Sequence, residues 1–416
     1  MDTEQARENV VLAGKKLLES GLIARTWGNV SCRISDRQFV ITPSGRPYET
    51  LNPEEIVPVN IEDGSYNGDI KPSSEKDLHA EIYKHRKDVN FIIHTHQANA
   101  SALSPLGEDI PVSDPEAVSC FGEKVACAAY GLPGSQKLKK EAIAALARTE
   151  GKAILLAYHG AVCLGSDMEE AFQVASDLEK ISNDFACRRY GEISGEVIND
   201  ADKLREDFVK LISAGAVDEV KEPQINLYNS VRKGGRFYLY SGSAENGPFA
   251  EEASCFRDIR IKNPAEHKKA DNLPVEAELH REIYSRYKNV GAIIHTTLPD
   301  IVAVSLTGKK LVPLLDDFAQ IIGTSARAAD YDSSVQSIKV VAGKLKGKNA
   351  VLIRGRGALC TGPGKYDASA AVLVLDKGCK AMICSTLLGK VKPINPFEAM
   401  LMRYIYLKKY SKKIQR

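Results

Sequence analysis

Two apolar runs in this sequence end in histidines, and these histidines are the residues best suited to chemistry. His94 and His96 end the run that starts at Phe91, and His159 follows the apolar run 153–158. On a β-strand, side chains two positions apart share one face, so His94 and His96 would point the same way. Three imidazoles that leave one position open are the ligand set of catalytic zinc and of related divalent ions. The pattern therefore predicts a metal site at His94, His96 and His159, with three unrelated polar residues at strand ends as the alternative.

A glutamate and three short polar clusters accompany the histidines. Glu75 precedes a helix predicted at about 76–87, for which Ser74 is the expected N-cap. Glu75 is either a first-turn glutamate that the helix dipole favours or a carboxylate that acts as a base near the metal. The clusters are rich in small residues whose N–H groups and hydroxyls suit a phosphate, although each alone is also an ordinary turn. They contain Gly28, Asn29, Ser44, Gly45, Ser73 and Ser74.

The elements that must position these residues occur twice. The segment 78–95 recurs as 279–296 with a constant offset of 201 residues, which pairs His79 with His280 and Tyr130 with Tyr331. Because His79 recurs at a helical position, we expect it to have a packing role. A constant offset over this length indicates a tandem duplication. The charged, proline-containing stretch at 221–224 is the expected boundary, which gives domains of residues 1–222 and 223–416.

Hydrophobic periodicity predicts alternating helices and strands in the first copy. The first helix should be capped by Thr3, end at Gly21 and share one apolar face among Val11, Leu12, Leu17 and Leu18. Further helices are expected near 76–87, 97–104, 135–149 and 168–190, and strands at 30–34, 39–42, 89–94 and 153–158. This alternation indicates an α/β layered sandwich, and it leaves the order of the strands open.

Composition limits the class of protein. The 416 residues hold 56 Lys and Arg against 54 Asp and Glu, so no broad basic field is available to a nucleic acid. No apolar run approaches the roughly 20 residues of a membrane span, and the N-terminus lacks the basic and apolar regions of a secretory signal. The nine cysteines form no C-x-x-C pair and indicate thiols in a reducing compartment. We therefore expect a cytoplasmic protein without nucleic-acid or membrane partners.

Taken in order, the polar motifs closely resemble the class II aldolase/adducin family, in particular its L-fuculose-phosphate aldolase branch. The ordered set is Gly28-Asn29-Val30-Ser31, Ile41-Thr42-Pro43-Ser44-Gly45, Pro72-Ser73-Ser74-Glu75, His94-Thr95-His96 and Tyr158-His159-Gly160. The resemblance covers about residues 1–200 with every motif present and about 225–390 in eroded form. It implies two tandem three-layer α/β/α sandwich domains, each with a mixed, mostly antiparallel central sheet.

The resemblance also implies roles for the matching residues. His94, His96 and His159 would bind one divalent metal per chain, usually Zn²⁺, although manganese, cobalt or iron also accept imidazole ligands. Glu75 would transfer the proton and would also reach the metal in an empty site. The residues Gly28, Asn29, Ser44, Gly45, Ser73 and Ser74 would hold the phosphate of a sugar-phosphate substrate. Tyr130 resembles a family tyrosine that assists at the aldehyde oxygen in a neighbouring subunit's site.

The reaction implied by the resemblance is retro-aldol cleavage of a ketose 1-phosphate to dihydroxyacetone phosphate and an aldehyde. A pentulose-phosphate 4-epimerase and a thioribulose-phosphate dehydratase stay open, because both would use the same site. Epimerases of the family tend to carry aspartate at the position of Glu75, which favours the aldolase. A non-catalytic, adducin-like interaction protein is the alternative from another class.

The second copy departs from the pattern. Its ligand positions are His295, Thr297 and Arg356, so we expect it to bind no metal. The Gly-Asn-Val-Ser and Pro-Ser-Gly motifs have no clear counterpart in it. The second copy is then a scaffold, or, because the family forms ring tetramers, two chains form a homodimer that is a pseudo-tetrameric ring with two active sites. In such a ring, Tyr331 could serve the active site in place of Tyr130.

Overall fold

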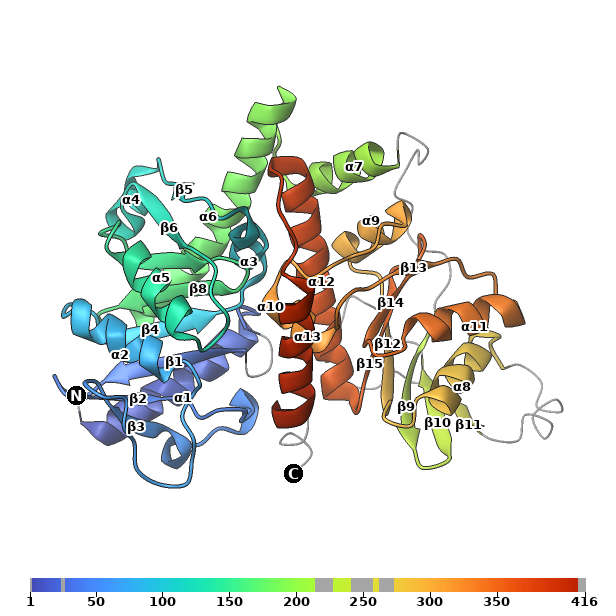
Figure 1. The fold of residues 1–416 in the computed structure, drawn as a ribbon, viewed down its shortest axis with the longest axis horizontal. Coiled ribbons are helices and arrows are strands. Elements are labelled where there is room, and N and C mark those ends of the chain that lie inside the picture. The colour runs from blue at the N-terminus through green and yellow to red at the C-terminus, as the bar shows by residue number, and fades with distance from the viewer. Residues whose placement is uncertain (1, 24–26, 214–226, 241–256, 262–272, 411–416) are drawn as a thin grey trace. The chain divides into compact units, whose positions relative to one another are not determined.

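The computed structural model describes residues 2–23, 27–213, 227–240, 257–261 and 273–410. They form two compact units (Figure 1). The first unit comprises Met1–Asn199 with Leu388–Lys392 and Leu407–Arg416, and the second comprises Asp200–Leu387 with Pro393–Tyr406. The boundary expected at 221–224 lies outside the described residues.

Helix α7 (Ala201–Ile212) falls in the second unit, although the expected boundary placed it in the first domain. The helix packs against α9 (Pro299–Thr307), and its buried residues Leu204, Phe208 and Val209 form one face. The described chain therefore changes units near Asn199, ahead of the expected position.

The first unit is built on an eight-stranded sheet in the order β3-β2-β1-β4-β8-β7-β6-β5. Only β6 and β7 run parallel, and every other neighbouring pair is antiparallel. The strands are β1 (Gly28–Arg33), β2 (Gln38–Ile41), β3 (Val57–Asn60), β4 (Phe91–Thr95), β5 (Ile110–Pro111), β6 (Lys124–Ala128), β7 (Ala153–Leu156) and β8 (Gly160–Gly165).

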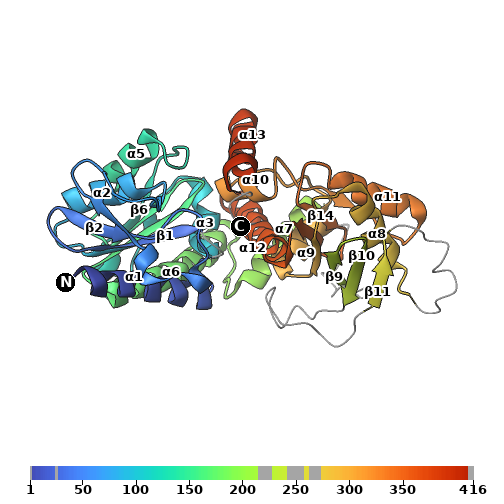
Figure 2. The ribbon, with the colours of Figure 1, turned by 90° about the horizontal axis from the view of Figure 1, so that it is seen from below.

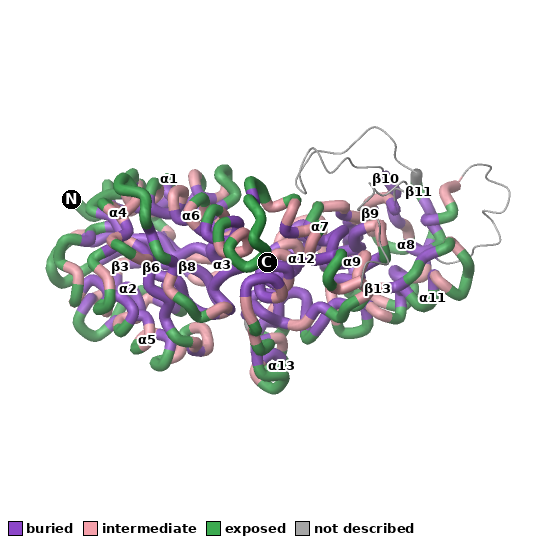
Figure 3. Tube along the Cα trace, turned by 90° about the horizontal axis from the view of Figure 1, so that it is seen from above, coloured by how far each residue is buried: buried purple, intermediate pink, exposed green. Residues whose placement is uncertain are grey.

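Helices cover both faces of this sheet (Figure 2). One face carries α2 (Lys76–His85) and α5 (Gln136–Leu146), which pack together, and the other carries α1 (Thr3–Glu19) and α6 (Met168–Ser194). The short helices are α3 (Ala98–Leu103), α4 (Pro115–Phe121) and the 3-10 turns η1 (Tyr48–Thr50), η2 (Pro53–Glu55) and η3 (Ser104–Leu106). The strands are buried, whereas the outer faces of the helices are exposed (Figure 3). The expected three-layer sandwich with a mixed, mostly antiparallel sheet is confirmed.

The second unit repeats this topology, with the pairing of β5 reduced to an isolated antiparallel bridge between Leu311 and Ala326. Its seven-stranded sheet has the order β11-β10-β9-β12-β15-β14-β13, and only β13 and β14 run parallel. The strands are β9 (Asn229–Lys233), β10 (Arg236–Tyr240), β11 (Arg257–Arg260), β12 (Ala292–Thr296), β13 (Ala328–Ala329), β14 (Ala350–Ile353) and β15 (Ala358–Gly362). The same strand order in both units confirms the duplication.

The helices of the second unit pack in the same way as those of the first unit. Helices α8 (Glu276–Arg286) and α11 (Val335–Lys344) pack together, and α9 packs against β14 and β15. The others are α10 (Asp316–Ile321), α12 (Lys365–Leu388) and α13 (Pro396–Ile405). The π-helical turn η6 (Tyr406–Tyr410) follows α13, and its residues from Leu407 on belong to the first unit. Among the described helices, none is long and apolar enough to cross a membrane.

A buried hydrogen-bonded triad is also duplicated. In the first unit Ser31 Oγ lies 2.7 Å from His79 Nδ1 and 2.8 Å from the Tyr83 hydroxyl. In the second unit Ser230 Oγ lies 2.6 Å from His280 Nδ1 and 2.9 Å from the Tyr284 hydroxyl. Both histidines are fully buried, and burial lowers the pKa of each to about 4. The packing role expected for His79 is confirmed.

The triad corrects one expectation about the second copy. Strand β9 carries Ser230 and pairs with β12 as β1 pairs with β4, so the Gly-Asn-Val-Ser segment does have a structural counterpart. It was missed because its offset is 199 residues, which differs from the 201 of the following segment. A counterpart of Pro-Ser-Gly would fall after β10, outside the described residues.

Several expected details of the first unit are wrong. Asp2, and not Thr3, caps α1, because its carboxylate accepts a hydrogen bond from the Gln5 N–H at 2.8 Å. Leu12 is 53% exposed, since the face of α1 that packs on the sheet is centred on Val10 and Leu17.

Strand ends also differ from those expected. The strand expected at 153–158 stops at Leu156, because Tyr158 has a φ of 64° and turns the chain. Strand β6 was not expected, since its five residues carry a weak β signal.

Candidate active site

The three histidines lie together with Gly28 and Asn29 where several strands of the first sheet begin or end. Strand β1 runs antiparallel to β4, with Asn29 paired to His94, so the start of β1 lies beside the end of β4. Strands β4 and β7 are both antiparallel to β8, and their carboxyl ends therefore meet at the same edge. His96 follows β4 and His159 follows β7, which is why two distant segments converge there.

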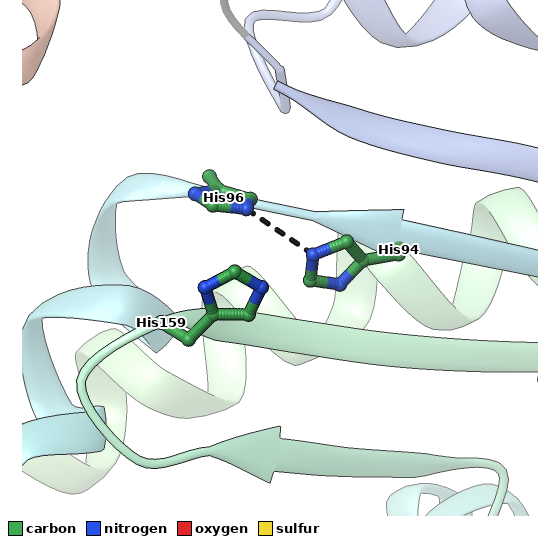
Figure 4. Close-up of side chains that lie close together, drawn as sticks. All are labelled: His94, His96 and His159. Carbon is green, nitrogen blue, oxygen red and sulfur yellow. Dashed lines mark hydrogen bonds between the residues drawn. The ribbon is translucent and has the colours of Figure 1, made fainter. Parts of the chain in front are cut away.

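The three imidazoles form a compact group (Figure 4). Each offers a nitrogen, and these three atoms all lie within 4.8 Å of one another. His94 and His159 stack with their ring centres 4.8 Å apart, while the ring of His96 stands edge-on to both. His94 and His159 are buried and His96 is half-buried, so the group is open on one side. Such a group could hold a metal ion and leave room for a substrate.

The donor chemistry of His94 fits a metal ion. Its Nδ1 lies 2.8 Å from the carbonyl oxygen of Ala161, which can only accept, so Nδ1 carries the proton. The lone pair of Nε2 then faces His96 Nε2 at 3.1 Å. Two nitrogens bound to one tetrahedral ion at about 2.0–2.1 Å would lie about 3.3 Å apart, close to this separation. A carbonyl that orients a histidine in this way is typical of metal ligands. Burial, the main cause, also holds the pKa of His94 well below its usual range, which favours the neutral ligand form.

Glu75 joins the same group. Its Oε1 lies 3.1 Å from His159 Nε2, and its Oε2 lies 3.3 Å from His94 Nε2. The side chain is buried, and burial acts to raise its pKa. The two neighbouring histidines and the hydrogen bonds from His159 and Asn29 outweigh burial and hold the pKa of Glu75 well below its usual range. A buried carboxylate is thus present in its basic form beside the imidazoles.

Helix α2 begins at Lys76, as expected, but its N-cap residue differs from the expected one. Glu75, and not Ser74, occupies the N-cap position, and Ser74 is exposed. The hydroxyl of Ser73 accepts the Glu75 N–H at 3.3 Å, which ties the start of the helix to the preceding turn. Glu75 makes no capping hydrogen bond with its side chain, because its carboxylate faces the histidines.

The polar clusters lie side by side. A bridge joins Pro43 to Pro72, the Ser44 N–H donates to the carbonyl of Lys71 at 2.9 Å, and the Ser73 N–H donates to that of Thr42 at 3.0 Å. Thr42 Oγ1 in turn accepts the Val30 N–H at 3.2 Å, which links both loops to β1. The segments with Ser44, Gly45, Ser73 and Ser74 are therefore brought together next to the start of β1.

Gly28 and Asn29 each make a different contact near the site. Gly28 has a φ of 111°, and a Cβ there would collide with the backbone oxygen of His94. The side chain of Asn29 is directed at Glu75, with Nδ2 donating to Oε2 at 2.9 Å. Its Oδ1 is buried without a hydrogen-bond partner among the described residues.

The two candidate tyrosines lie in unlike surroundings. Tyr130 is half-buried and packs edge-on against Tyr158, with ring centres 5.3 Å apart, next to His159. Tyr331 is 6% exposed, and its ring lies 5.7 Å from the guanidinium carbon of Arg356 within the second unit.

Sequence reasoning missed Tyr48 as a supporting residue. Tyr48 is buried, and its hydroxyl donates to the carbonyl of Gly28 at 3.2 Å. A Cβ at Gly14 of α1 would collide with its ring, so α1 packs tightly over it. The proximity of Tyr48 to the Ser44-Gly45 turn was the only available signal, and it does not reveal the contact with Gly28.

Parts of the chain are similar to known proteins. The model of the family described as class II aldolase and adducin N-terminal domain matches residues 8–183 and 230–383. The chain is 34% identical to 5-deoxy-D-ribulose 1-phosphate aldolase of Bacillus thuringiensis over 177 residues, 42% of this chain and 82% of that protein. It is 34% identical to L-fuculose phosphate aldolase of Methanocaldococcus jannaschii over 166 residues, 40% of this chain and 87% of that protein.

A solved structure of L-fuculose 1-phosphate aldolase is 28% identical, with a TM-score of 0.43, over 48% of this chain and 92% of that chain. Each of these relatives thus matches less than half of the present chain. The two segments that match the family model together make up most of the chain. The chain therefore belongs to the class II aldolase and adducin N-terminal domain family, and it carries the family's domain twice.

Proposed function

We propose that the first unit is a metal-dependent aldolase that cleaves a ketose 1-phosphate to dihydroxyacetone phosphate and an aldehyde. The observation that carries this proposal is the position of Glu75, whose two carboxylate oxygens each face a histidine of the candidate metal site. A buried base beside such a site is suited to moving a proton at a carbon next to a polarised carbonyl.

The ion would be held by His94, His96 and His159, with Glu75 in reach when no substrate is present. We propose Zn²⁺, since three imidazoles suit zinc, and one ion per chain, since the second unit has His295, Thr297 and Arg356 at the equivalent positions. When bound, the ion supplies Lewis-acid stabilisation of the negative charge that develops on the substrate oxygens.

The residues of this chain would bind the phosphate and transfer the protons. The adjoining loops with Gly28, Ser44, Gly45, Ser73 and Ser74 would hold the phosphate through N–H groups and hydroxyls. In the condensation direction, Glu75 takes a proton from the carbon of dihydroxyacetone phosphate that forms the new bond, and Tyr130 donates a proton to the aldehyde oxygen. Cleavage reverses the two transfers. The names of the relatives, aldolases of 5-deoxyribulose 1-phosphate and of fuculose phosphate, support a ketose phosphate as substrate.

We further propose a cytoplasmic homodimer in which two chains form a ring of four similar domains. Helix α13 supports an interface, because it presents apolar side chains along one exposed face. These are Phe397, Met400, Leu401, Tyr404 and Ile405. A reducing compartment is supported by the eight described cysteines, none of which forms a disulfide with another described residue.

The function is tested by screening ketose 1-phosphates for aldehyde release with the wild-type chain and with Glu75→Gln. We expect Glu75→Gln to keep the metal and to lose about 10²–10⁴-fold in kcat, the usual contribution of a general base. Glu81→Gln, on the same helix with its carboxylate near Lys84 and His85, is the matched control and should keep its activity.

Full activity in Glu75→Gln would remove Glu75 from the mechanism. An epimerised ketose phosphate without aldehyde release would show that the site performs another reaction of the same family.

A further inference from the structure

The second unit keeps the location of the active site and changes its chemistry. Arg356 lies in the turn between β14 and β15, where the first unit has His159 between β7 and β8. The Arg356 N–H donates to the carbonyl of Ile353 at 2.9 Å, as the His159 N–H donates to that of Leu156 at 3.0 Å. The glycine after each residue, Gly357 or Gly160, leaves no room for a Cβ against a threonine carbonyl of the neighbouring strand. The two turns are therefore equivalent, and an arginine has replaced a ligand.

His295, the one histidine kept at the ligand positions of the second unit, hydrogen-bonds to the backbone through both ring nitrogens. His295 Nδ1 accepts the Leu227 N–H at 3.3 Å, and Nε2 donates to the carbonyl of Arg356 at 2.7 Å. Both ring nitrogens are used, so His295 has no lone pair left for an ion. Glu276, the first residue of α8, matches Glu75 at the offset of 201 residues. Glu276, Tyr331 and Arg356 are together called the second-unit site.

The second-unit site contains polar groups that lack partners. Nη1 of Arg356 and the hydroxyl of Tyr331 are buried, and neither makes a hydrogen bond among the described residues. Ser333 lies near the Tyr331 hydroxyl without the geometry of a hydrogen bond. Glu276 is 8% exposed, and no ion pair or hydrogen bond of its carboxylate joins it to a described residue. An unsatisfied buried polar group destabilises the fold, so a ligand that pairs with these groups would be stabilised in return.

The charges of the second-unit site act on one another. Burial is the main cause that raises the pKa of Tyr331. The nearby Ser333 opposes the rise, Glu276 adds to it and Arg356 opposes it. The guanidinium carbon of Arg356 lies 5.7 Å from the centre of the Tyr331 ring. A cation, a phenol and a carboxylate thus lie around one location in the fold.

We propose that the second-unit site binds a small anion that carries hydroxyl groups, a sugar phosphate or a sugar acid. The planar guanidinium of Arg356 matches a phosphate or a carboxylate, and Tyr331 supplies a second donor. Glu276 accepts hydrogen bonds from hydroxyl groups at the other end of the ligand. Glu276 also repels a bare anion, which gives the site a preference for ligands with hydroxyl groups. This proposal does not depend on the activity proposed for the first unit.

The test is calorimetric titration of the full chain with glycerol 3-phosphate, D-glycerate and inorganic phosphate. The variant is Arg356→Gln, and the matched control is Arg354→Gln, which removes the same charge from an exposed arginine of the same turn. We expect Arg356→Gln to weaken one binding site at least about tenfold, as loss of a charge-assisted hydrogen bond does, while Arg354→Gln leaves it unchanged. Any binding of these anions to the first unit is common to both variants and cancels in the comparison.

The probe that binds identifies the anion: glycerol 3-phosphate for a phosphate and D-glycerate for a carboxylate. Equal isotherms for Arg356→Gln and Arg354→Gln, or no binding to the second unit by either probe, would overturn the proposal. If Arg356→Gln does not fold in a thermal unfolding assay, Glu276→Gln replaces it. That variant should bind inorganic phosphate more tightly and glycerol 3-phosphate more weakly than the wild type, and unchanged affinities for both would overturn the proposal.

Discussion

The side-chain amide of Asn29 donates to Oε2 of Glu75 at 2.9 Å, although 46 residues separate the two in the sequence. The same oxygen faces His94 Nε2 at 3.3 Å, so the amide fixes the rotation of the carboxylate relative to the histidines. Asn29 was expected to contact a phosphate, and its side chain instead contacts the proposed base. We therefore propose it as a positioning residue.

Replacing Asn29 tests that role. We expect Asn29→Ala to lower kcat by about 10–100-fold, the usual effect of losing a group that orients a ligand or base, with little change in KM and with the metal retained. Asn60→Ala, which removes an amide from a surface turn, is the control. A rise in KM with kcat unchanged would return Asn29 to the phosphate site.

The catalytic tyrosine is predicted to be Tyr130. Tyr331 is buried beside Arg356 in its own unit, whereas Tyr130 is half-buried next to the residue that precedes His159. We expect Tyr130→Phe to lower kcat by about 10²-fold, as loss of a general acid does, and Tyr66→Phe at an exposed tyrosine to serve as the control. A larger loss of kcat in Tyr331→Phe than in Tyr130→Phe would assign the role to Tyr331.

Local patterns predicted alternating helices and strands and singled out the three histidines, and the resemblance to the family implied the three-layer architecture. The spacing of His94 and His96 on a strand, and the strand before His159, require no long-range information. The duplication predicted a second sheet of the same kind.

The supporting contacts could not be predicted, because they join residues that are distant in the sequence. The contact of Asn29 with Glu75 depends on the pairing of β1 with β4, and the strand order was left open. The path of the chain near Asn199 depends on the packing of α7, which an amphipathic pattern alone does not assign to a unit.

Gly160 is predicted to be essential for the geometry of the site. A Cβ at this position would collide with the backbone oxygen of Thr95, between the two histidine-bearing segments. We expect Gly160→Ala to lower the free energy of unfolding by about 1–3 kcal/mol, as overpacking does, and to reduce metal content as His159 moves. Gly235→Ala, where a Cβ meets open space, is the control, and a thermal midpoint equal to that of the control would contradict the prediction.

Helix α13 is predicted to lie in the dimer interface. Leu401 is 48% exposed in the single chain, and Leu401→Glu would place a charge among the apolar side chains of the exposed face. We expect this change to raise the dimer dissociation constant at least about tenfold in analytical ultracentrifugation. Val335→Glu changes an exposed apolar residue of α11 and should leave the dimer intact. Equal dissociation constants for the two variants would place the interface elsewhere.

The most direct test of a metal-dependent first unit is the metal content per chain, measured by mass spectrometry on purified, untagged protein. We predict one divalent ion per wild-type chain, its loss in His94→Ala, and its retention in His85→Ala, which changes an exposed histidine of α2. No metal after incubation with zinc would contradict the proposed aldolase and favour a binding or scaffold role. Two ions per chain would contradict the assignment of Arg356 and Thr297 to a unit without a metal site.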